Sequence, residues 1–202
     1  MMVKVFKCLA IIFVAIVLTA CGPIATKPMN SYTLSSLRQS LRASHPRTKL
    51  TLLVSNPIAA PGYQTSAMIY METPFELESF ADNRWVAPPA QMLLPMFVRA
   101  LRNTSYFYAV VSPPFSGITN LRLDTELIKL QQEFLLPTSR VRLVVQASLI
   151  SNVTNHVVAS RQFEVVVPTS ENNPYGGVLA ANRAAALISR EIAQFAVRFS
   201  RR

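Results

Sequence analysis

Three consecutive segments in the second half of the chain alternate between apolar and polar residues, and this pattern limits the fold more than any other feature. They span residues 121–130, 141–149 and 157–167, with short turn sequences between them. A period of two is typical of β-strands that have one face on a core and the other in water. We therefore predict an antiparallel meander, in which Arg161 is the exception on an apolar face formed by Leu121, Leu123, Leu127, Val141, Leu143, Val145, Ala147, Leu149, Val157, Ala159, Phe163, Val165 and Val167.

The last segment, residues 176–202, has the spacing of an amphipathic helix. Its apolar residues recur every three or four positions, and Gly176-Gly177 marks its predicted start. The arginines near its end favour the negative end of the helix dipole. Such a stripe also fits a coiled-coil seam, but at this length we favour a helix lying on a sheet. The stripe consists of Val178, Ala181, Ala185, Ile188, Ile192, Phe195 and Phe199.

The first half predicts shorter elements. Strands are expected at 32–34, 48–57, 66–73 and 75–80, with a loop at 38–47 and a turn at 81–84. Pro88-Pro89 opens a helix that runs to about residue 104, where Pro95 is expected to kink it or delay its start. Leu93, Phe97, Ala100 and Leu101 share one face of it. These elements make residues 31–202 one α+β domain, a two-layer structure with a mainly antiparallel sheet and two helices packed on one face.

The first twenty residues have the order of an export signal. Met1–Lys7 carries two lysines and no acid, and Cys8–Leu18 is an unbroken apolar run of 11 residues. A spanning helix needs about 20 apolar residues, so a retained membrane anchor or a buried core helix is disfavoured. The run ends in Leu18-Thr19-Ala20-Cys21, which looks like a bacterial lipobox. We predict that residues 1–20 are a signal peptide and that Cys21 becomes the acylated first residue.

Residues 21–30 then form the lipidated cysteine and its tether. Gly22–Asn30 contains two prolines and no hydrophobic period. Nine residues at about 3.3 Å each reach about 30 Å at most, so the domain is expected close to the membrane. Glycine after the cysteine resembles enteric lipoproteins that are not retained at the inner membrane. That resemblance implies an anchor in the outer membrane facing the periplasm, with the inner membrane less favoured.

The net charge is strongly positive. Removing residues 1–20 takes away two lysines and no acid, so 18 basic and 10 acidic residues leave a charge of +8. A basic balance attracts nucleic acid, anionic lipid or an acidic protein. Export excludes nucleic acid, and a solvated basic surface with no specific ligand stays open.

Residues with catalytic or metal-binding potential are few. The five glycines form no phosphate-binding loop, and no nucleophile elbow marks a serine. His45 and His156 lack a second ligand at metal spacing, so we predict no metal and no cofactor. Glu76 and Glu78 are two residues apart on an expected strand, where they would share a solvated face. We therefore expect no enzyme activity. A Ser-His-Asp triad whose members are far apart in the sequence stays open, because such a triad leaves no local motif.

One stretch carries a family resemblance. Residues 70–111 place Tyr70 at the end of a strand, then a hairpin, Trp85, Pro88-Pro89 and an aromatic-rich strand. This arrangement resembles the ABC-type transport auxiliary lipoproteins, which include the paraquat-inducible protein C-like lipoproteins of MCE lipid-transport systems. The resemblance implies a periplasm-facing accessory subunit whose partners are an MCE protein and the permease. It supplies no catalytic residues, and we expect Trp85 to be a hydrophobic staple for the following helix.

Three functional hypotheses follow. The leading one is a docking subunit of an envelope lipid-transport complex, and whether the chain assembles with copies of itself stays open. The second is a stand-alone lipoprotein that binds a lipidic or small ligand between the sheet and the helices. The third is an envelope hydrolase, which a cleft with converging histidine, serine and acid side chains would revive.

Overall fold

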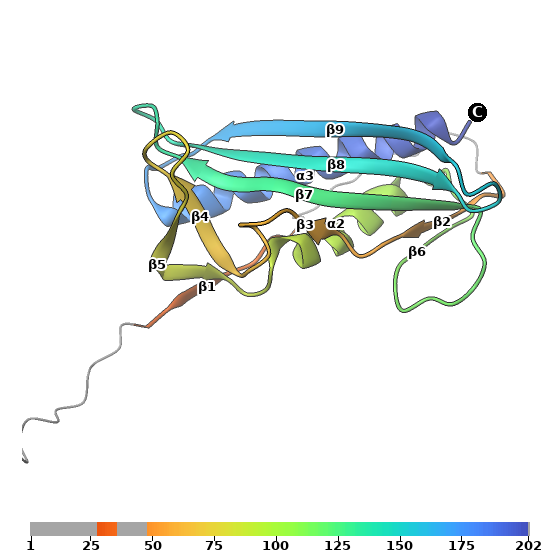
Figure 1. Cartoon of the computed structure of the whole chain (residues 1–202), viewed down its shortest axis with the longest axis horizontal. Helices are drawn as coiled ribbons and strands as arrows, with labels where there is room; N and C mark the ends of the chain where they lie inside the picture. The colour runs from red at the N-terminus through yellow and green to blue at the C-terminus, as the bar shows by residue number, and fades with distance from the viewer. Residues whose placement is uncertain (1–27, 36–47, 202) are drawn as a thin grey trace, which may run out of the picture.

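The computed structural model describes residues 28–35 and 48–201. Cys21 and the loop predicted at 38–47, with His45, lie outside these ranges. Within them the chain forms a nine-stranded sheet and two long helices (Figure 1). The elements are β1 (Asn30–Tyr32), β2 (Thr51–Val54), β3 (Ile58–Ala59), β4 (Ala67–Met71), β5 (Glu78–Trp85), α2 (Pro89–Asn103), β6 (Ala109–Val111), β7 (Leu121–Glu133), β8 (Arg140–Ser151), β9 (Val157–Pro168) and α3 (Pro174–Phe199).

The predicted meander forms the main part of the sheet. β7, β8 and β9 pair antiparallel along almost their whole length. The apolar positions of β8 are buried, as their alternation predicts, and so are Phe163, Val165 and Val167 of β9. Val157, at the start of β9, is exposed because it lies beside the turn that ends the hairpin.

The other edge of β7 is covered by a single stretch of chain. β2, β3 and β4 follow one another along β7 and all run parallel to it, beginning at Leu52 beside Leu121 and ending at Met71 beside Glu133. Pro57 and Pro61 interrupt this stretch because proline has no amide hydrogen for the ladder. The sheet is therefore mixed, with short parallel pairs on one side of β7 and the long antiparallel pairs on the other.

The turn predicted at 81–84 is wrong. Those residues lie inside β5, where Asn83 and Arg84 pair with β1. The chain reverses earlier, in the loop 72–77, so the strand expected at 75–80 begins only at Glu78. Aspartate and asparagine are tolerated in β5 because much of this strand remains partly accessible to water.

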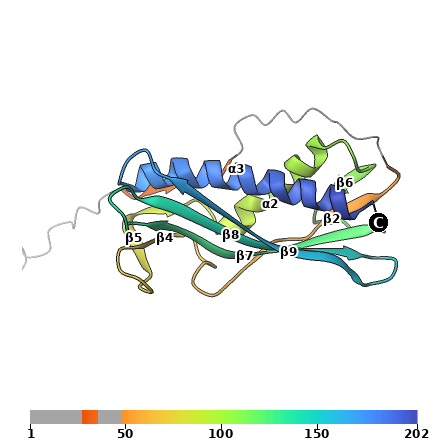
Figure 2. The same ribbon diagram turned by 90° about the horizontal axis from the view of Figure 1, so that it is seen from above.

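The two helices cover one face of the sheet (Figure 2). α3 packs along β8 and β9, α2 lies beside it over β2, β3, β6 and β7, and the two helices contact each other. Every predicted stripe residue of α3 is buried except Phe199, which is partly buried. The predicted α+β architecture, with two helices on one face, is therefore confirmed, and the coiled-coil alternative is excluded for this helix.

Each helix begins differently from the prediction. α3 starts at Pro174, before Gly176-Gly177, because the Asn173 side chain caps it by accepting from the Gly176 amide at 2.8 Å. α2 begins at Pro89 and continues through Pro95, so Pro95 does not delay its start. Pro95 is exposed, as is Gln91 one turn before it, so water can reach the carbonyl that loses its helical partner.

The first described segment is fixed to both helices. After β1, Leu34 is buried and its amide contacts the Met92 sulfur of α2 at 3.5 Å. The Ser35 amide donates to the Asn182 side chain of α3 at 2.8 Å.

No helix among the described residues combines the length and the apolar character needed to cross a bilayer.

Candidate docking surface

The residues that carry the family resemblance lie in and around the β4–β5 hairpin and the start of α2. The ring of Tyr70 stacks on Phe80 with 4.4 Å between centroids, and its hydroxyl donates to Glu78 at 2.8 Å. This hydrogen bond raises the pKa of Tyr70. Pro88 caps α2, and Pro89 occupies the first turn, where its missing amide hydrogen has no helical partner to lose.

Trp85 ends β5 and is buried in the core. It lies near Gly177 and Ala181 of α3, and its amide donates to the Ser66 carbonyl at 2.8 Å. The residue directly before the α2 cap, where a hydrophobic staple lies, is Ala87. Trp85 therefore joins β5 to α3 instead of stapling α2.

Beside the first turns of α3, the space between the sheet and the helix is too small for a lipid. Beside Trp85, Gly177 and Ala181 it measures about 20 Å³, which is room for about one water molecule. Ligand pockets usually measure about 300–1,000 Å³. The described residues thus offer no room at this position for the ligand of the second hypothesis.

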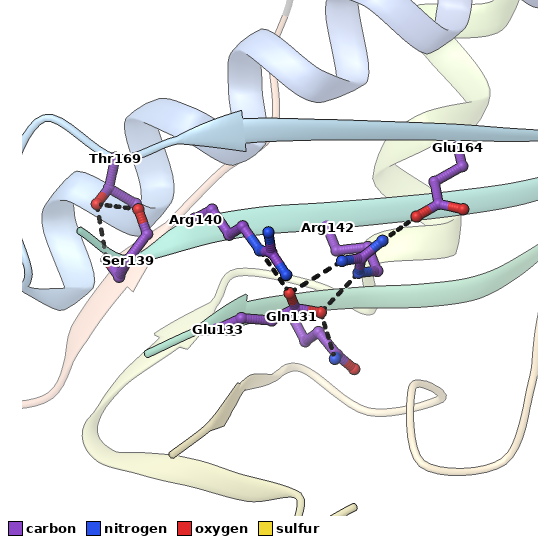
Figure 3. A network of polar contacts seen from close by, with 7 residues as sticks. All are labelled: Gln131, Glu133, Ser139, Arg140, Arg142, Glu164 and Thr169. Carbon is purple, nitrogen blue, oxygen red and sulfur yellow. Dashed lines mark hydrogen bonds and ion pairs between the residues drawn. The ribbon is translucent and has the colours of Figure 1, made fainter. Parts of the chain in front are cut away.

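A buried carboxylate lies on the face of the sheet opposite the helices (Figure 3). Glu133 accepts from Arg142 Nε at 2.6 Å, from Arg140 Nε at 2.9 Å and from Gln131 Nε2 at 3.1 Å. Arg142 also pairs with Glu164 of β9. The network thus joins β7, β8 and β9 through side chains. Tyr63 covers it and donates its hydroxyl to Gln131.

The electrostatics of this network follow from its geometry. Burial by itself raises the pKa of Glu133, but the hydrogen bonds from Arg142 and Arg140 and the charge of Arg142 together outweigh it, so the pKa lies below its ordinary value. Glu133 in turn raises the pKa of Arg142. Burial, followed by the charge of Glu133, raises the pKa of Tyr63. The charged side chains of the network pair with one another across β7, β8 and β9, so we assign this network to stability.

The other candidate groups lie apart. Glu78 is the first residue of β5 and accepts a hydrogen bond from Tyr70 of β4. Glu76 lies in the loop before β5, so the two carboxylates do not share a strand face. His156 is exposed in the turn before β9. Among the described residues no group of three or more histidine, cysteine or acidic side chains has the arrangement of a metal site.

A basic surface lies at the end of the molecule where α3 terminates. It consists of Arg161 in β9 and of Arg198 and Arg201 at the end of α3, and we call it the arginine face. Each guanidinium lies over an aromatic ring at 5.0–5.7 Å from the ring centre: Arg161 over Phe163, Arg198 over Phe199 and Arg201 over Tyr106. Such cation–π contacts help to hold these side chains in place.

Two shallow grooves run across the arginine face. One, of about 370 Å³, separates β9 from the last turns of α3. Its charged lining residues are Arg161, Arg198 and Glu191, so positive charge exceeds negative charge by one. The second, of about 230 Å³, shares Gln194 and Arg198 with it. In the described part of the chain, β9 pairs only with β8, so its outer edge borders the first groove. Exposed arginines and a strand edge together suit a protein partner.

The sequence shows the arginines of this surface but does not show that they lie close together. Arg161 is the one charged residue on an apolar strand face, and Arg198 and Arg201 were explained by the helix dipole. Their proximity depends on α3 crossing β9 at this end, which no local pattern reveals. An arginine at an otherwise apolar strand position was the available signal.

The fold and this surface define an α+β domain with an open groove that carries two arginines and one glutamate. The chain belongs to the ABC-type transport auxiliary lipoprotein family, whose model matches residues 32–193. No curated protein matches the chain.

Solved structures share the fold. Protein XCC0632 from Xanthomonas campestris has a TM-score of 0.78 at 21% identity, with 85% of this chain and 97% of that one covered. An uncharacterized protein has a TM-score of 0.67 at 15% identity, with 84% and 99% covered. A hypothetical protein from Chlamydia trachomatis has a TM-score of 0.51 at 7% identity, with 74% and 98% covered. At these identities the likeness concerns the fold alone.

Proposed function

We propose that this chain is the membrane-anchored accessory subunit of an MCE-type ABC lipid-transport system that moves lipid between the inner and outer membranes. The family match over residues 32–193 carries the proposal, because it associates the domain with ABC-type transport. The proposal gives the chain no catalytic step and no cofactor. ATP hydrolysis and lipid carriage belong to separate chains.

The work of this subunit would be docking. Acylated Cys21 holds it in the outer membrane on the periplasmic side, and the arginine face receives an acidic surface of the MCE protein or permease. The exposed arginines support this role, since arginine is enriched at the centres of protein interfaces.

A pull-down from detergent-solubilised envelopes tests the proposal. We expect the tagged lipoprotein to recover the MCE protein and the permease, and an unrelated tagged outer-membrane lipoprotein to recover neither. Recovery of no transporter component would count decisively against the docking role.

The anchor has its own test. Cys21→Ser removes the acylation site while leaving every described residue unchanged, so we expect a folded protein that no longer sediments with membranes. The signal peptide is replaced by an ordinary cleavable one so that processing continues. A processed variant that stays in the membrane pellet would contradict the anchor.

A further inference from the structure

Two neighbouring loops expose apolar side chains at the end of the molecule opposite the arginine face. Phe75, in the loop between β4 and β5, is 100% exposed. Leu135 and Leu136, in the turn between β7 and β8, are also exposed, Leu136 at 53%. A single exposed apolar residue is common on protein surfaces, but these three lie on two adjoining loops, and groups of exposed apolar residues mark interaction sites.

The backbone directs Phe75 outward at a cost. Its φ angle is +70°, in the left-handed region that bulky residues avoid. Glycine or asparagine would adopt this turn without strain, and neither would present an apolar surface. Strained positions of this kind concentrate at functional sites.

The two loops stand on a shared and rigid base. β4 and β7 end side by side at Met71 and Glu133, and the Phe134 amide donates to the Met71 carbonyl at 2.8 Å. The ring of Phe134 meets Tyr70 edge-on, with 6.0 Å between centroids. Both loops project at the same end of the long axis in both views (Figure 1, Figure 2).

The chain also enters the fold at this end. β1 lies there in both views (Figure 1, Figure 2), and the first described residue is Pro28. Six residues separate Cys21 from Pro28, a reach of about 20–25 Å when fully extended. An acylated Cys21 therefore holds this end, and not the arginine face, next to the bilayer.

We propose that the tips of these two loops, with Phe75, Leu135 and Leu136, insert into the surface of the lipid bilayer that holds Cys21. The inference rests on the proposed anchor and adds a second, non-covalent contact that sets the orientation of the domain. The apolar side chains enter the boundary between headgroups and acyl chains, where large apolar residues are favoured.

The acidic residues beside Phe75 indicate which headgroup charge the loop tips favour. Glu72 and Glu76 flank Phe75 in the same loop. Carboxylates repel anionic headgroups. The tips therefore suit a zwitterionic surface, and raising the fraction of anionic lipid is expected to weaken their insertion.

Site-specific quenching tests the proposal on the lipidated protein. Acylation blocks Cys21, so in Phe75→Cys only the new cysteine reacts with an environment-sensitive dye. The protein is reconstituted into phosphatidylcholine vesicles that contain a spin-labelled lipid. We expect the dye at position 75 to shift to the blue and to lose most of its emission by quenching.

The matched control is Ile118→Cys, because Ile118 is 98% exposed in the loop before β7, at the opposite end. We expect no quenching there. Equal quenching at both positions, or none at position 75, overturns the proposal. A third outcome also overturns it. If Phe75→Ser abolishes recovery of transporter components in the pull-down, and the same substitution leaves the quenching of a dye at Leu136→Cys unchanged, the loops bind a protein and not the bilayer.

Failure of the anchor is seen separately. If the unsubstituted protein reacts with the dye, Cys21 is a free thiol and both the anchor and this proposal fall. If Cys21 is blocked and the protein floats with the vesicles, but position 75 is not quenched, only the loop contact is wrong.

Discussion

At the scale of single residues, the most informative side chain is one that the hydrophobic pattern leaves unexplained. Glu133 has only 5% of its side chain exposed, yet it lies on the sheet face away from the helices. Four N–H donors from three residues surround it, and two of these residues carry a guanidinium charge. A buried carboxylate with partners like these stabilises a protein in its ionised form, and removing it leaves the partners unsatisfied.

We predict that Glu133→Gln lowers the free energy of unfolding at pH 7 by about 3 kcal/mol, the low end for a broken buried ion pair, because the arginines remain partly solvated. The folded-state pKa of Glu133 is depressed, so its contribution is fully present above the unfolded pKa of about 4.3. It is lost as the pH falls through the lower, folded pKa. Urea denaturation at a series of pH values measures this, with the two proteins converging in acid.

Glu126→Gln is the matched control, because Glu126 lies in the same strand and forms no ion pair with a described residue. A change within about 0.5 kcal/mol is expected there, as for most surface substitutions. A difference between Glu133→Gln and the unchanged protein that stays constant down to pH 2 would contradict the electrostatic account.

The network around Glu133 could not be predicted from the sequence. The sequence Gln131-Gln132-Glu133 reads as the polar end of a strand, and the predicted strand stops at residue 130. A bulge between Leu127 and Lys129 shifts the alternation by one residue. Gln132 therefore faces α3, while Gln131 and Glu133 face the other side. Period-two reasoning cannot anticipate such an inserted residue, because it changes the face of every residue after it.

At the scale of elements, the long periodic segments were predictable and the junctions were not. α3 and the meander follow from uninterrupted stripes of apolar residues, because each stripe can be buried in only one orientation of its helix or strand. The hairpin turn was misplaced because Asp82 and Asn83 have turn composition, whereas the chain actually reverses at Phe75. The parallel pairing of β2, β3 and β4 with β7 depends on contacts between residues about 70 positions apart, which no local pattern contains.

The start of α3 gives a prediction at this scale. A Cβ on Gly176 would overlap the backbone oxygen of Glu171. We expect Gly176→Ala to destabilise the protein by about 1–3 kcal/mol, the usual cost of overpacking. Helix propensity alone predicts the opposite, a gain of about 1 kcal/mol for alanine over glycine. The midpoint of urea denaturation decides the sign.

Arg183→Ala provides the comparison, as an exposed position further along the same helix. It is expected to change stability by less than about 0.5 kcal/mol. If Gly176→Ala proves as stable as the unchanged protein, the loop 169–173 accommodates the added carbon and the close packing at this junction is not required.

At the scale of the whole molecule, the two ends have opposite characters. The end with β1 carries the apolar loop tips together with Glu72 and Glu76, whereas the end where α3 terminates carries the arginine face. α3 has 26 residues and is therefore about 39 Å long. If the proposed anchor holds the first end at the bilayer, the arginines lie about 40 Å away from that bilayer and are accessible to protein partners.

The arginine face is therefore predicted to bind the partner by position as well as by charge. We expect Arg161→Glu combined with Arg198→Glu to abolish recovery of transporter components in the pull-down, while membrane fractionation stays unchanged. Reversing Arg198 at the end of α3 is expected to lower the free energy of unfolding by about 1 kcal/mol, which leaves the domain folded. The control reverses two other exposed charges, Lys129→Glu with Arg183→Glu, and so has the same net charge. Nonspecific attraction depends on net charge, so it predicts equal loss in both double variants. A surface built from charges held over aromatic rings predicts loss only in the first, and equal recovery by both variants would move the docking site elsewhere on the domain.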